Sequence, residues 1–114
     1  MKWVKQSIHY WCPDTKEHKF LGQNVTVAIL DTGISPHPDF KGRILSFRDF
    51  SSTTGSSEKV LFSFSHFSPL IDNSGHGTHV AGILAGSGLL SSGTYAGIAP
   101  FCNLIIGKVL DQNG

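Results

Sequence analysis

The sequence has little charge of either sign, few cysteines and no long hydrophobic run. Nine Lys and Arg residues against eight Asp and Glu give a net charge of +1 over 114 residues. This balance gives no indication of nucleic acid as a partner. No apolar run approaches the ~18 residues of a membrane span, so we expect no membrane partner either. Cys12 and Cys102 come without a visible export signal and are predicted to be reduced thiols.

The chain also lacks internal repeats and a recognisable leader. The stretch from Met1 to Cys12 has no continuous hydrophobic core, so no signal peptide is predicted. The location stays open, with the cytoplasm favoured. The length fits one domain, 1–114, with a modest core. Within it we expect an N-terminal arm at 1–20 and an insertion at about 51–70.

Three segments are predicted to be strands. Val25–Leu30 is an apolar run without polar alternation, which is typical of a parallel strand buried on both faces. Arg43–Phe50 is a second candidate, and Asn103–Leu110 is predicted to be a third, buried strand. Asp31 follows the first strand directly. Its carboxylate is therefore expected at the carboxyl end of the strand, where open α/β sheets place their sites.

A glycine-rich helix is predicted to begin near His76. The stretch Asp72–Gly86 has the sequence DNSGHGTHVAGILAG. Gly costs about 1 kcal/mol against Ala in a helix interior, so these glycines indicate tight packing against another element. Strand, crossover helix and strand form a βαβ unit, which favours a parallel sheet. The imidazole of His76 would then lie at a helix N-terminus, at the rim of a packed layer.

Asp31 and His76 are the candidate chemical pair. They are 76 − 31 = 45 residues apart, but each is expected at the same edge of the sheet. A carboxylate facing a histidine fixes its tautomer and stabilises the imidazolium that forms when the ring takes a proton. A helix N-terminus disfavours that charge, whereas Asp31 favours it. Opposed effects of this kind can hold the pKa of a general base near the working pH.

Taken singly, these residues allow other interpretations. An Asp after a strand is commonly a turn or cap residue. A single His near a helix start is more often a satisfied polar side chain than a catalyst. His76 and His79 could also bind a metal, with Asp72 as a third ligand, although no Cys or HExxH pattern supports that spacing. A small metal-binding α/β module therefore remains an alternative.

Two stretches resemble the Asp and His signatures of the subtilisin-like serine proteases. They are VAILDTGISPHPDF, which contains Asp31, and GHGTHVAGILAG, which contains His76. YAGIAP and LIIGKVLDQNG resemble the segments that follow the His signature. The resemblance runs from about Phe20 to Gly114, with a gap at roughly 51–70. It implies an α/β fold of three α/β/α layers with a parallel sheet, present here as an N-terminal fragment of the catalytic domain.

The resemblance also implies roles for individual residues. Asp31 would be the triad acid and His76 the general base, and His79 would be structural and buried. Leu110 would form a wall of the pocket for the residue that precedes the scissile bond. The implied activity is that of a serine endopeptidase acting on peptide or protein substrates.

The chain departs from the family pattern at the nucleophile. The family's serine, in a Gly-Thr-Ser-Met-Ala type of motif, lies well beyond the histidine, and none of the serines in this sequence stands in such a motif. We therefore expect the serine beyond Gly114, the C-terminal half of the same domain as a partner, and no activity from these 114 residues alone. The rival is a truncated, inactive product that acts as a binding or folding partner.

A calcium site is suggested and then disfavoured by the same resemblance. Asp39 resembles a residue that binds calcium in some relatives. The loop that would complete such a site looks short here, from Ser87 to Tyr95. We therefore expect no metal and no cofactor.

Overall fold

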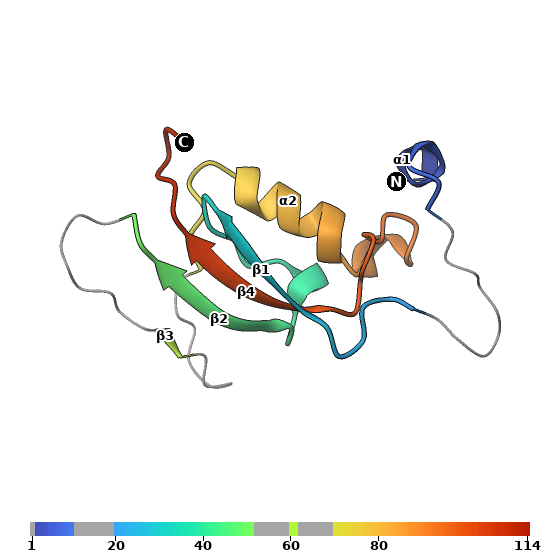
Figure 1. Ribbon diagram of the computed structural model, residues 1–114, viewed down its shortest axis with the longest axis horizontal. Coiled ribbons are helices and arrows are strands. Elements are labelled where there is room, and N and C mark those ends of the chain that lie inside the picture. Colours follow the sequence, from blue (N-terminus) through green and yellow to red (C-terminus); the bar gives the residue numbers. More distant parts are fainter. Residues whose placement is uncertain (1, 11–19, 52–59, 62–69) are drawn as a thin grey trace.

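In the computed structural model, residues 2–10, 20–51, 60–61 and 70–114 are described. They form one four-stranded sheet with one longer helix beside it (Figure 1). The elements are α1 (Lys2–Ser7), β1 (Thr26–Asp31), β2 (Ile44–Asp49), β3 (Val60–Leu61), α2 (His76–Ala85) and β4 (Asn103–Lys108), with short 3-10 turns at Pro38–Phe40 and Leu89–Ser91.

The sheet has the order β1-β4-β2-β3, and β4 lies parallel to both β1 and β2. The three predicted strands and the parallel sheet are thus confirmed. β1 includes Asp31, one residue beyond the predicted end, whereas β4 ends two residues before Leu110. The short β3 pairs antiparallel with β2 at the edge. It lies in the expected insertion at 51–70, most of which falls outside the described residues.

Helix α2 packs on one face of the sheet through small residues, as its composition predicts. Gly77, Ala81 and Ala85 are buried at four-residue spacing, which places them on one side of the helix. A Cβ built at Gly77 would lie 2.3 Å from the carbonyl oxygen of Gly33, so only glycine permits this approach to the chain that follows β1. The buried core consists of Ile29, Ile34, Phe40, Phe47, Ala81, Ala85, Cys102, Leu104 and Ile106.

The opposite face of the sheet is exposed. Ala28 and Leu30 of β1 point away from α2, and Leu30 is 67% exposed. The prediction that Val25–Leu30 is buried on both faces is therefore wrong for this chain, because no described element covers the second face. The subtilisin-like α/β arrangement is confirmed, but only one helical layer is present among the described residues.

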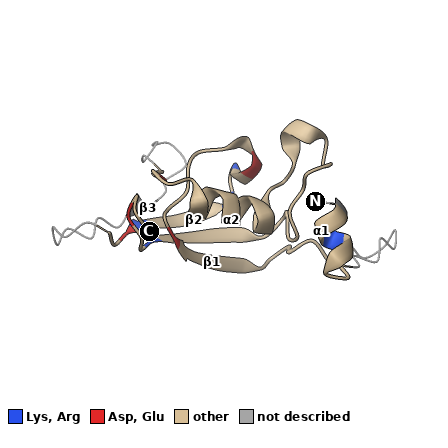
Figure 2. Cartoon of the chain, turned by 90° about the horizontal axis from the view of Figure 1, so that it is seen from above, with Lys and Arg blue, Asp and Glu red and all other residues tan. Residues whose placement is uncertain are grey.

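The charged residues of the three longer strands gather at their carboxyl ends, near the C-terminus in Figure 2. Asp31 and Asp49 each lie beside Lys108 in the register of the parallel sheet. Helix α2 has no Asp, Glu, Lys or Arg at all. The charged side chains of these strands therefore all lie at the carboxyl edge of the sheet, and α2 adds none.

The N-terminal arm is hydrogen-bonded to the rest of the chain through Tyr10, whose Oη donates to the carbonyl of Ile98 at 3.0 Å. Cys102 is a buried free thiol, whereas Cys12 lies outside the described residues. None of the described helices has the length and apolar character needed to cross a membrane.

Candidate active site

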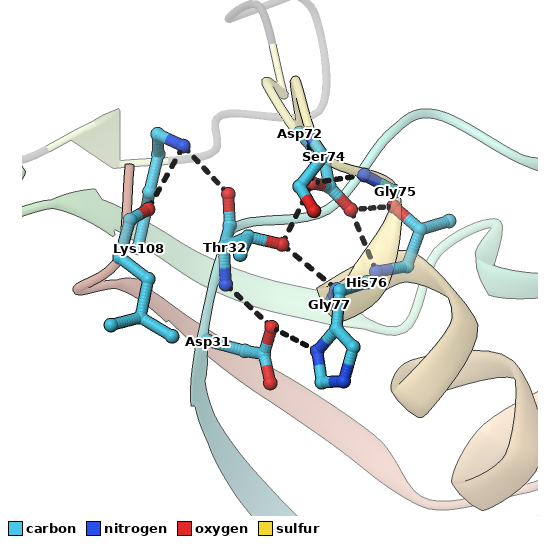
Figure 3. A network of polar contacts seen from close by, with 10 residues as sticks. Asp31, Thr32, Asp72, Ser74, Gly75, His76, Gly77 and Lys108 are labelled. Atoms are coloured by element: carbon cyan, nitrogen blue, oxygen red, sulfur yellow. Dashed lines mark hydrogen bonds and ion pairs between the residues drawn. The ribbon is translucent and has the colours of Figure 1, made fainter. Parts of the chain in front are cut away.

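Asp31 and His76 come together at the carboxyl edge of the sheet. Asp31 is the last residue of β1 and His76 the first of α2, and His76 Nδ1 lies 2.8 Å from Asp31 Oδ1 (Figure 3). The Asp31 side chain is 14% exposed, whereas the His76 side chain is 65% exposed. Within the described part of the chain, the second ring nitrogen, Nε2, has no hydrogen-bond partner. The predicted contact is therefore present, with one face of the ring open.

The electrostatics of the pair favour a charged carboxylate and a basic ring. Partial burial opposes ionisation of Asp31, but hydrogen bonds from His76 and from the Thr32 amide outweigh it and hold the pKa of Asp31 below its ordinary value. The hydrogen bond to Asp31, followed by the charge of Asp31, raises the pKa of His76. Burial of the ring opposes this increase in the pKa of His76, and the contact with Asp31 outweighs it.

A second carboxylate, Asp72, organises the start of α2. Its Oδ1 accepts hydrogen bonds from the Thr32 hydroxyl at 2.8 Å and from the Gly75 amide at 2.8 Å. Its Oδ2 accepts from both the amide and the hydroxyl of Thr78. Gly75 is the N-cap residue and has no side chain to cap the helix, so Asp72 satisfies amides that the helix leaves unpaired.

The metal interpretation of Asp72, His76 and His79 is wrong. Burial opposes ionisation of Asp72, but the hydrogen bonds from Thr78, Gly75 and Thr32 prevail and hold its pKa well below the ordinary value. Both of its oxygens are thus already occupied by local donors. His76 uses Nδ1 on Asp31 instead of turning toward Asp72. No group of three or more potential ligands that could hold a metal occurs among the described residues.

His79 is exposed, so the expectation of a buried second histidine is also wrong in this chain. The face of α2 that meets the sheet is set by Gly77, and His79 lies roughly 200° further round the helix, at about 100° per residue. Its side chain instead lines an open hollow of about 360 Å³ beside the turn at Pro38–Phe40, together with Ser35, His37 and Gly82.

Leu110 lies just past β4 and is tied to the acid by the backbone. Its amide donates to the carbonyl of Asp31 at 3.2 Å, and the neighbouring Val109 amide donates there at 2.8 Å. The residue is 39% exposed, and its role as a pocket wall stays a prediction. Leu110 therefore stays a candidate.

Lys108 is a polar residue that sequence reasoning missed. It is 4% exposed, and its Nζ donates to the carbonyls of Thr32 at 2.7 Å and of Leu110 at 3.2 Å. It thus links the peptide that follows Asp31 to the segment that follows β4. The available signal was a lone lysine at the end of the apolar run that begins at Asn103.

The position that resembles a calcium ligand does not fit a cation. The two carboxylate oxygens of Asp39 accept backbone amides, from Gly88 at 3.1 Å and from Leu89 at 3.2 Å. N–H groups aimed at a carboxylate compete with a metal for its lone pairs and present positive charge to an approaching cation. The carbonyl of Asp39 accepts from the Arg43 guanidinium. The oxygens of Asp39 therefore serve as acceptors for neighbouring backbone amides and for Arg43.

The comparisons with known proteins agree with this geometry. A sequence model of the subtilase family matches residues 22–114. The chain is 50% identical to serine protease AprX of Bacillus subtilis (strain 168) over 93 residues, which are 82% of this chain and 18% of AprX. It is 41% identical over 95 residues to the major intracellular serine protease of the same organism, covering 82% of this chain and 26% of that protein.

Subtilisin E of the same organism is 39% identical over 103 residues, which are 90% of this chain and 23% of subtilisin E. The chain therefore spans only about a fifth to a quarter of the length of these curated relatives. Each comparison covers the region that contains the Asp31–His76 pair.

Proposed function

This chain belongs to the subtilase family, and from that premise we propose that it supplies the acid and the base of a serine endopeptidase. Asp31 is the acid and His76 is the general base of an Asp-His-Ser triad. The serine lies in the C-terminal half of the same catalytic domain, beyond these 114 residues. The substrates are peptides or proteins.

The observation that carries the proposal is the 2.8 Å contact between His76 Nδ1 and Asp31 Oδ1 on a ring that is otherwise exposed. A carboxylate is only an acceptor, so Nδ1 must carry the proton in this contact. In the neutral ring Nε2 then has the free lone pair. That nitrogen faces the side of the ring where a nucleophile can approach.

The mechanism follows from this tautomer. Nε2 of His76 takes the proton of the serine hydroxyl as its oxygen attacks the peptide carbonyl. Asp31 stabilises the imidazolium that results, and the ring then gives the proton to the leaving amine. Asp31 is held for this task because its Oδ1 also accepts the Thr32 amide at 2.7 Å. Leu110, exposed beside Asp31, is the proposed wall of the pocket for the substrate residue that precedes the scissile bond.

The proposal is tested by joining this chain to the part of AprX that follows the matched segment. We expect the joined protein to hydrolyse a fluorogenic peptide and to react with a fluorophosphonate. The 114-residue chain alone is expected to do neither. Unmodified AprX serves as the positive control, and circular dichroism reports whether the joined protein is folded.

Two outcomes would contradict the proposal. One is a joined protein that folds but hydrolyses no peptide while AprX does, which would favour a role in binding or folding. The other is covalent labelling of the chain alone at one of its own serines.

A further inference from the structure

The exposed ring of His76 is held by little more than one contact. Its side chain is 65% exposed and, within the described residues, makes a single hydrogen bond, to Asp31. A hydrogen bond at an exposed position contributes little net free energy because water competes for both partners. The orientation of the ring must therefore depend on how firmly the backbones of Asp31 and His76 are held relative to each other.

The Thr32 hydroxyl joins these two backbones. Thr32 is 2% exposed. Its Oγ1 donates to Asp72 Oδ1 at 2.8 Å and accepts from the Gly77 amide at 2.9 Å. Thr32 directly follows Asp31, and Gly77 directly follows His76. One hydroxyl therefore connects the residue after the acid with the residue after the base (Figure 3).

Asp72 holds that hydroxyl and brackets His76 from both sides. The Gly75 amide before His76 and the Thr78 amide after it each donate to Asp72 at 2.8 Å. The carboxylate thus orients the Thr32 hydroxyl so that its lone pair faces the Gly77 amide. The same side chain fixes the first turn of α2.

We propose that Thr32 and Asp72 are positioning residues for the Asp31–His76 pair, and that they act through the Thr32 hydroxyl. Neither side chain hydrogen-bonds to the imidazole. They hold the two backbones so that Nδ1 stays on Asp31 and Nε2 stays free. The link to catalysis rests on the proposed function. The effect of Thr32 and Asp72 on the orientation and tautomer of the His76 ring does not depend on it.

The test uses the 114-residue chain with histidine-selective 15N labelling and NMR. In the wild type, neutral His76 is expected as the Nδ1–H tautomer, because the nitrogen that meets the carboxylate keeps the proton. Thr32→Val removes the hydroxyl at nearly constant shape. We expect it to shift His76 toward the Nε2–H tautomer, to lower its pKa toward the ordinary value of 6.5, and to speed exchange of the Nδ1 proton about fivefold. Thr32→Ser keeps the hydroxyl and is expected to keep the wild-type signals.

Thr78→Val is the matched control. It removes another hydroxyl bound to Asp72, one that accepts the Ser35 amide and so lies away from Asp31. We expect it to lower stability but to leave the tautomer of His76 unchanged. The proposal is overturned if Thr78→Val changes the tautomer as much as Thr32→Val does. It is also overturned if folded Thr32→Val keeps the wild-type tautomer.

If Thr32→Val does not fold, the Asp72→Asn variant tests the positioning role in its place. It keeps the shape but weakens the hold on the Thr32 hydroxyl, so the tautomer should shift in the same direction. An unchanged tautomer in folded Asp72→Asn would reject the inference. Asp31→Asn separates this inference from the proposed function. If Asp31→Asn leaves the tautomer unchanged, the Asp31–His76 pair itself is wrong; if it changes the tautomer while Thr32→Val does not, only the positioning role fails.

Discussion

The two ends of helix α2 are held by side chains of opposite charge. At the N-terminal end, amides of Gly75 and Thr78 donate to the carboxylate of Asp72. At the C-terminal end, the Arg43 guanidinium donates to the carbonyl of Ala85 at 2.5 Å and to that of Cys102 at 2.7 Å. This is the arrangement that the helix dipole favours, with an anion at the start of the helix and a cation at its end.

The ends differ in what they leave free. Carbonyls in the last turn of α2 all have donors: the Ile98 amide donates to the carbonyl of Ile83, and the Ala99 amide donates to the carbonyl of Leu84. At the first turn, the Gly77 and Thr78 amides are likewise paired, but the His76 ring projects outward with Nε2 unpartnered in the described chain. The C-terminal end therefore anchors the helix, and the N-terminal end keeps one basic atom available for chemistry.

The largest expected effect is at the N-terminal end, on activity. In the joined enzyme described above, Asp31→Asn should lower kcat by about 10⁴-fold, because the ring loses the acceptor that fixes its tautomer. The measurement is hydrolysis of a fluorogenic peptide under saturating substrate. Asp49→Asn, at the end of β2, is the control and should stay near wild type. A loss below about tenfold for Asp31→Asn would contradict the assigned role.

The next effect concerns the C-terminal end and stability. Arg43→Met removes donors from carbonyls on three separate segments, so we expect a loss of about 2–4 kcal/mol in the free energy of unfolding. Urea unfolding measures it. Arg48→Met is the matched control, because Arg48 Nε is buried without a partner in the described structure and its guanidinium lies over Phe50. Equal losses for the two variants would show that Arg43 is not the anchor.

A smaller, pH-dependent effect is expected from Asp72. Asp72→Ala should cost about 1–2 kcal/mol at pH 6, since it removes the capping carboxylate. The folded pKa of Asp72 lies below its ordinary value of 3.8, so this contribution is present above that pH and is lost as the pH falls through the folded pKa. The difference between wild type and variant should therefore shrink below about pH 4. Urea titrations at several pH values measure the difference; one that stays constant down to pH 2 would contradict the account.

The smallest effect is expected for His79, the exposed histidine of the same helix. His79→Gln should change the unfolding free energy of this chain by less than about 0.5 kcal/mol, as is usual for exposed positions. Thermal and urea unfolding measure it, with Ala81→Ser on the buried face of α2 as the contrasting variant. A loss above about 1 kcal/mol for His79→Gln would mean that this side chain has a structural role after all.

Local pattern was enough to place the strands, the helix and the Asp31–His76 pair. The apolar runs around Ile29 and Ile106 and the small residues of α2 each specify one kind of element. Because parallel strands end at a common edge, a carboxylate after β1 and an imidazole at the start of α2 had to lie near each other. The two signatures then indicated the family.

The sequence by itself determined these elements, because each depends on neighbours only a few residues away, and it determined the chemical pair because the two residues end and begin elements at a common edge of the sheet. Only the tertiary structure decided the partners of Asp72, the exposure of His79 and the open face around Leu30. From the sequence, Asp72 was a candidate metal ligand, but in the structure its Oδ1 accepts a hydrogen bond from the hydroxyl of Thr32, 40 residues earlier in the chain. A hydrogen bond between distant segments leaves no periodic trace in the sequence. Burial depends in the same way on which element covers a face, and that is settled only when the layers pack.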